Sequence, residues 1–254
     1  MRIDTQGQIA FVDSLPLAPP AQVHVGRAFS GHLLPAMRGM TADGGSGEQT
    51  AYVAKGSLVS FVAGVDQAAR ADVLDALLFA QLGADERFDR ERDFDHWHRF
   101  YLLVMQNVGW TVEVLDFAPP VLERFTVGEL GLALLQTNAS AAEQRAADAT
   151  LASARHRVPA VFDQSSHSSD AGCFHVGTCS QLAQRIETTL ICIHFHTGLR
   201  VTQLLKHVFD RRTTRYGASI YRCSLDLAAH APVALQIRKK LADDVGVFIH
   251  ELAL

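Results

Sequence analysis

The stretch IETTLICIHF, residues 186–195, is rich in β-branched and aromatic residues. Such a composition predicts a strand that enters the hydrophobic core. Four other segments in the second half of the chain have the same β character: 160–162, 172–178, 201–209 and 219–227. Because these segments follow one another along the chain, we expect most of them to pair as antiparallel neighbours.

Helical patterns surround this group of strands. Apolar residues recur at helical spacing after Asp66, as far as Leu82, and again over residues 94–105. Two capping boxes, at residues 126–129 and 140–143, mark the starts of two further helices, because each pairs a Thr or Ser with a Glu three positions later. Pro232 is placed to begin a last helix, since proline is favoured in a first helical turn.

Two earlier segments have strand character, residues 52–62 with a break at Gly56, and residues 110–117. Residues 1–50 differ in composition, with several prolines and a glycine-rich end, and we expect an arm with strands near residues 8–12 and 23–29.

The order of elements predicts the fold class. We expect one α/β (α+β) domain over residues 51–254, preceded by an N-terminal arm and loop over residues 1–50. A mainly antiparallel sheet of five to seven strands would lie between helix pairs, in three layers, because amphipathic helices need a sheet or one another to cover their apolar faces.

Composition limits the function classes. The chain has 254 residues, of which 23 are basic and 27 acidic, and its formal charge of −4 argues against a nucleic-acid partner. The first residues lack the basic and apolar regions of a secretory signal, so we expect a cytoplasmic protein as synthesised, with release by a non-Sec route left open. The longest apolar runs fall well short of the roughly 20 residues of a membrane-spanning helix.

Four cysteines lie in the second half of the chain and form no C-x-x-C pair: Cys173, Cys179, Cys192 and Cys223. In a chain of this length without a secretory signal, we expect reduced and mostly buried thiols. A bridge between Cys173 and Cys179 across a bend stays an alternative.

The pair His194 and His196 is the main candidate for chemistry. Two residues separated by one position on a strand point to the same face, so both imidazoles could bind one divalent metal ion. A third ligand would come from His175, Cys192 or His207. The alternative is that these histidines simply lie at the surface or at strand ends, without any cofactor.

Three other motifs have simpler explanations. His96 and His98 diverge by about 200° on a helix and cannot easily share one ion. The serines and histidine of residues 165–168 lack a G-x-S-x-G motif and an acidic partner, so a solvated loop is expected. The glycine-rich residues 44–47 lack the lysine of a phosphate-binding loop.

Over residues 50–250 the order of strands and helix pairs resembles that of the Cyt-type cytolysins of insect-pathogenic bacteria, and of related virulence proteins and fungal haemolysins. The resemblance implies a three-layer α/β/α domain that binds membranes and forms pores or lyses them, with residues 186–227 as the inserting strands. Residues 61–65, 72–74 and 107–110 also resemble a family of poorly characterised bacterial and fungal proteins, for which we assign no activity.

Three functions follow as hypotheses. The first is a non-enzymatic, toxin-like or virulence-type protein that perturbs lipid membranes. The second is a protein-interaction or self-assembling module, which forms homo-oligomers through the N-terminal arm. The third is a metal-dependent enzyme centred on His194 and His196.

Overall fold

The computed structural model describes residues 4–19, 48–118, 120–242 and 244–254. In this part of the chain, seven strands form one sheet in the order β3-β8-β6-β5-β2-β1-β9. All neighbours in it are antiparallel except β2 and β5. The predicted α/β class, with a mainly antiparallel sheet, is therefore confirmed.

The strands of the large sheet have these bounds: β1 Thr50–Ala54, β2 Ser57–Phe61, β3 Thr111–Leu115, β5 Ala171–Leu182, β6 Arg185–Thr197, β8 Thr214–Asp226 and β9 Ile249–Leu252. A second, two-stranded sheet joins β4 (Arg124–Phe125) to β7 (Phe209–Asp210).

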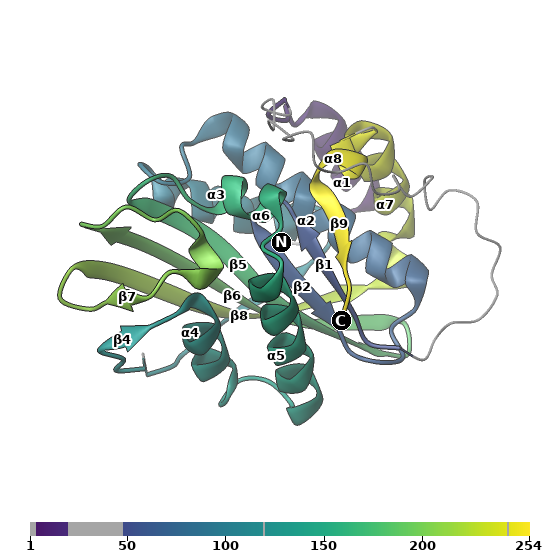
Figure 1. Ribbon diagram of the computed structural model, residues 1–254. Helices are drawn as coiled ribbons and strands as arrows, with labels where there is room; N and C mark the ends of the chain where they lie inside the picture. The colour runs from purple at the N-terminus through teal and green to yellow at the C-terminus, as the bar shows by residue number, and fades with distance from the viewer. Residues whose placement is uncertain (1–3, 20–47, 119, 243) are drawn as a thin grey trace.

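The helices have these bounds: α1 Thr5–Ser14, α2 Gln67–Arg87, α3 Phe94–Asn107, α4 Val127–Leu135, α5 Ala141–His156, α6 Ala160–Ser166, α7 Leu227–Leu241 and α8 Asp244–Phe248, with a 3-10 turn, η1, at Leu204–Lys206. Figure 1 shows α4, α5 and α6 in front of the large sheet, and α1, α2, α3 and α7 behind it. The sheet is thus the middle of three layers.

The core lies on both faces of the sheet. Helix α2 is buried along most of its length and contacts α3 and α7. On α3, the predicted stripe of Trp97, Tyr101 and Met105 is buried against the sheet side. On the opposite face, α5 packs against β2 and β5. Side-chain contacts place α3 above the middle strands β5, β6 and β8, where the candidate site lies: Trp97 stacks on His175, Phe94 stacks on His194, and His98 hydrogen-bonds to Tyr221.

Local signals locate several elements correctly. Both predicted capping boxes form, with Thr126 and Ser140 as the N-cap residues of α4 and α5. Asp66 is the N-cap residue of α2, although its side chain makes no capping hydrogen bond. Lys55 and Gly56 are the two-residue loop that joins β1 to β2, and Lys55 takes the positive φ of 52° that this tight turn requires.

Several expected elements are wrong. Residues 160–162 begin the helix α6 with Pro159 at its N-cap. Residues 201–209 form a loop that contains the short turn η1, and only Phe209, the first residue of β7, is in a strand. Pro232 lies inside α7, which starts after its N-cap Asp226. The expected strand at residues 8–12 is part of α1, and the one at 23–29 lies outside the described residues.

The start of the predicted arm is packed on the domain. Helix α1 contacts α7, and Val12 and Leu15 belong to the hydrophobic core. At the other end of the chain, β9 pairs with β1 and forms one edge of the sheet, which the sequence patterns did not predict. Among the described helices, none combines the length and the apolar character needed to cross a bilayer.

Candidate metal centre

Two short motifs face each other on neighbouring strands. Cys173 and His175 lie one residue apart on β5, and Cys192 and His194 lie one residue apart on β6. In the antiparallel register Cys173 is opposite His194, and His175 is opposite Cys192. Because paired residues and residues two apart share a face, all four side chains belong to one face of the sheet.

Helix α3 adds a further donor over this face. His98 is buried there, with 7% of its surface exposed, while His175 and Cys192 are fully buried. Each of these three side chains offers one ligand atom, and the three atoms lie within 4.8 Å of one another. In the described part of the chain this is the one group of three or more His, Cys, Asp or Glu residues that is arranged in this way.

One ring nitrogen of each histidine is held by a neighbour. His175 Nδ1 lies 3.2 Å from the hydroxyl of Ser57, and His98 Nε2 lies 2.7 Å from that of Tyr221. The other ring nitrogen of each, His175 Nε2 and His98 Nδ1, is buried without a hydrogen-bond partner among the described residues. This arrangement is typical of metal-binding histidines, whose second nitrogen is oriented by an outer partner.

The β1–β2 loop explains the position of Ser57. The tight turn at Lys55 and Gly56 ends at Ser57, and the parallel pairing of β2 with β5 places Ser57 beside His175. The Ser57 hydroxyl also accepts a hydrogen bond of 3.2 Å from Gln81 of α2. Ser57 is therefore fixed from two sides, and it fixes the imidazole in turn.

A buried ion network continues from Gln81 towards the surface. Arg90 donates to Gln81 Oε1 over 3.2 Å and pairs with Asp85 at 3.3 Å. Asp85 also accepts from the Trp97 indole over 2.7 Å and pairs with Lys55. Burial alone would raise the pKa of Asp85, but the neighbouring Arg90 and Lys55 outweigh it and hold that pKa below its ordinary value.

The protonation states of the two histidines suit metal binding, whereas burial raises the pKa of the Cys192 thiol well above its ordinary value, so a metal ion would have to displace its proton. Burial lowers the pKa of His175 well below its ordinary value, and the nearby His98 and Arg90 add to the effect. Burial, together with the nearby His194, lowers the pKa of His98 to about 4. Both imidazoles are thus neutral at physiological pH, which is the form that binds a metal ion.

The predicted pair His194 and His196 has a different environment. Both side chains lie on the predicted common face, but His196 is exposed, and the His194 ring stacks on Phe94 with 3.9 Å between ring centroids. His207, one suggested third ligand, packs edge-on against Phe209. The other two suggestions, His175 and Cys192, belong to the group that includes His98 instead.

Sequence reasoning missed the repeated Cys-x-His motif. Each copy places a thiol and an imidazole on the same face of a strand. The two copies lie 19 residues apart, a spacing that is compatible with two strands of one β-hairpin. His98 carried no comparable signal, because only the tertiary structure brings α3 over these strands.

The four cysteines are free and buried, as expected for reduced thiols. The neighbour of Cys173 is Cys192, with 3.8 Å between the sulfur atoms, rather than Cys179. Cys179 instead accepts a hydrogen bond from Thr188.

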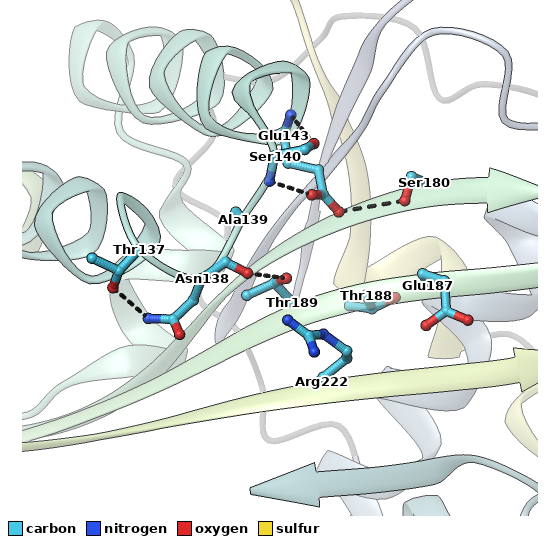
Figure 2. A pocket seen from close by; sticks show the side chains of 10 residues that line it. All are labelled: Thr137, Asn138, Ala139, Ser140, Glu143, Ser180, Glu187, Thr188, Thr189 and Arg222. Atoms are coloured by element: carbon cyan, nitrogen blue, oxygen red, sulfur yellow. Dashed lines mark hydrogen bonds between the residues drawn. The ribbon is translucent and has the colours of Figure 1, made fainter. Parts of the chain in front are cut away.

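A separate polar pocket lies on the opposite face of the sheet, below the α4–α5 connection (Figure 2). It has a volume of about 470 Å³. Glu143 is largely engaged there by the α5 capping box and by Ser180 at 3.4 Å, and Thr189 donates to the Asn138 carbonyl over 3.4 Å. Several polar groups that line the pocket therefore hydrogen-bond to one another. In the buried cluster, by contrast, His98 Nδ1 and His175 Nε2 have no hydrogen-bond partner among the described residues, so the cluster is the better candidate for a bound ion.

Comparison with known proteins assigns no family to the chain. No family model matches this sequence, and no curated protein matches it at a significant level.

Proposed function

We propose that this protein binds one transition-metal ion between α3 and the sheet, with His98, His175 and Cys192 as ligands. The observation that carries the proposal is the pair of buried imidazole nitrogens, His98 Nδ1 and His175 Nε2, that have no hydrogen-bond partner among the described residues. A buried polar atom without a partner costs about 1–3 kcal/mol, and an ion bound by both nitrogens would remove that cost.

The donor set narrows the choice of metal. Two imidazole nitrogens and one thiolate suit zinc, cobalt and copper, whereas magnesium and calcium prefer oxygen ligands. Like the hypothesis based on His194 and His196, this proposal places a metal ion on this face of the sheet. The ligands, however, are His98, His175 and Cys192.

Burial supports a role in structure rather than in turnover. At most 7% of the surface of any of the three ligands is exposed. A catalytic metal keeps a position open for water or substrate, which a site enclosed between two layers disfavours. A metal that joins α3 to β5 and β6 would instead stabilise the folded state in proportion to its binding free energy.

The test is metal binding by the full chain after chelation and reduction. Wild-type protein should bind one Co²⁺ or Zn²⁺ ion per chain, and its unfolding midpoint should rise as the metal is added. The variants His98→Phe, His175→Phe and Cys192→Ser should each bind at least about 10-fold more weakly, since each lacks a ligand.

His230→Phe is the matched control, because His230 is a buried histidine of α7 that lies outside the cluster. Circular dichroism of each variant establishes that it is folded before metal is added. If wild-type protein binds no metal, or if His230→Phe weakens binding as much as His175→Phe does, the proposal is wrong. A loss of binding in His194→Phe and His196→Ala alone would favour the originally predicted pair.

A further inference from the structure

We infer that Cys173 is the fourth ligand of this centre, so that the protein holds Zn²⁺ in a closed, tetrahedral site of two histidines and two cysteines. This inference rests on the proposed function and adds the metal and the coordination number. It is carried by a separate observation, the position of the second buried thiol beside Cys192.

The distance between the two thiols matches a zinc site. Cys173 Sγ and Cys192 Sγ are 3.8 Å apart. In a tetrahedral site with Zn–S bonds of about 2.3 Å, two thiolate sulfurs lie about 3.8 Å apart, because the edge of a tetrahedron is about 1.63 times the distance from its centre to a corner. The two sulfurs therefore already have the separation that one zinc ion would impose.

Charge favours two thiolates over one. Zn²⁺ bound by two thiolates and two neutral imidazoles has no net charge, whereas one thiolate would leave a net charge of +1 in the core. An uncompensated buried charge is strongly unfavourable, so a neutral set of ligands is favoured where every donor is buried. On binding, two S–H bonds break, two S–Zn bonds form, and both protons leave to water.

His194, opposite Cys173, is another donor on this face, and its Nδ1 is also buried without a hydrogen-bond partner among the described residues, but its ring packs against other groups. Its ring is stacked on Phe94 and lies over Gly217, where a Cβ atom would come within 2.3 Å of the imidazole. Cys173, in contrast, contacts Cys192 directly. Cys173 lies outside the group of three whose ligand atoms are within 4.8 Å of one another, so binding must draw its thiol towards the histidines.

Cobalt substitution measures the number of thiolates. Co²⁺ added to reduced apoprotein should give the intense visible bands of tetrahedral cobalt and a near-ultraviolet thiolate charge-transfer band. In Cys173→Ser that charge-transfer band should fall by about half, because one of two Co–S bonds is missing, and Zn²⁺ affinity should fall at least about 10-fold. X-ray absorption of the zinc protein should likewise find two sulfur neighbours in the wild type and one in the variant.

Cys179→Ser is the matched control, because Cys179 is also a buried thiol of β5 but interacts with Thr188 rather than with Cys192. It should leave the cobalt spectrum and zinc affinity unchanged.

If Cys173→Ser has the wild-type spectrum while Cys192→Ser loses binding, the inference about Cys173 is overturned and the three-ligand centre stands. If wild-type protein binds neither ion, both fail together. A preference for Cu⁺ over Zn²⁺ with a single sulfur neighbour would also overturn the closed zinc site.

Discussion

The hydroxyl of Ser57 lies 3.2 Å from Nδ1 of His175, and this contact joins the β1–β2 hairpin to the proposed metal centre. If Nδ1–H donates to Ser57, the lone pair of Nε2 is free for a metal ion. The hydrogen bond from Gln81 to the same hydroxyl links this orientation to α2. The position of the imidazole thus depends on three separate elements of the fold.

Ser57→Ala should therefore weaken metal binding by about 10- to 100-fold, the usual effect of removing an outer partner of a ligating histidine. Competition with a chromogenic zinc chelator measures the change. Ser60→Ala is the control, because Ser60 is also a buried serine of β2. Its side chain points to the opposite face of the sheet from Ser57, and its hydroxyl donates to the Gly177 carbonyl. Equal losses of affinity in the two variants would mean that Ser57 acts only through stability.

A second prediction concerns Gly172, which is opposite Phe195 in the β5–β6 pairing. A Cβ atom there would lie 2.5 Å from the Ser166 carbonyl oxygen and 2.6 Å from the Phe195 ring. Gly172→Ala should therefore destabilise the protein by about 1–3 kcal/mol through overpacking, as measured by urea denaturation. Gly198→Ala, where the nearest atom is 3.9 Å away, should change stability little. A neutral Gly172→Ala would show that α6 can move aside.

The sequence predicted the elements whose signals are local. A capping box needs only two side chains three residues apart, so the starts of α4 and α5 were correct. The segment at residues 160–162 was misassigned because a three-residue apolar run has no period, and the following residues continue it as a helix. Strand β9 has just four residues and only its pairing with β1 identifies it.

The candidate site was predictable only in part. Period-two alternation correctly placed His194 and His196 on one face, and the same rule applies to Cys173 with His175. What the sequence could not show is the register between β5 and β6, or the position of His98 above them, because both depend on contacts between distant segments. The membrane-perturbing and self-assembly functions stay predictions, which dye release from liposomes and deletion of residues 1–48 would test.

A third prediction concerns Asp85, whose carboxylate lies between Lys55, Arg90 and the Trp97 indole. Removing one partner from a largely buried ion pair leaves the other charges uncompensated. Asp85→Ala should therefore destabilise the fold by about 3–5 kcal/mol, as measured by urea denaturation. In Arg92→Ala, which removes the exposed pair with Asp89, the denaturation midpoint should hardly change. Similar midpoints for the two variants would show that the network around Asp85 contributes little.

The last prediction concerns acid sensitivity at His230, a buried residue of α7 whose Nδ1 lies 2.8 Å from the Val108 carbonyl oxygen. Burial lowers the pKa of His230 to about 4; the Val108 carbonyl opposes this shift, and Arg238 adds to it. In the unfolded chain the same group titrates near its ordinary pKa of about 6.5. Below that pH the unfolded state therefore binds more protons than the folded state, and stability falls as the pH is lowered from about 6.5 towards 4.

For one such histidine the loss amounts to about 2 kcal/mol between pH 7 and pH 5. His230→Gln keeps a side-chain N–H that can donate to Val108 but cannot be protonated in this range. Urea denaturation at both pH values should therefore show a smaller loss in the variant than in the wild type, by about that amount. Because His98 and His175 also have lowered pKa values, part of the acid sensitivity should persist in His230→Gln. Identical pH dependence in the two proteins would contradict this prediction, because it would mean that His230 has an ordinary pKa in the folded state.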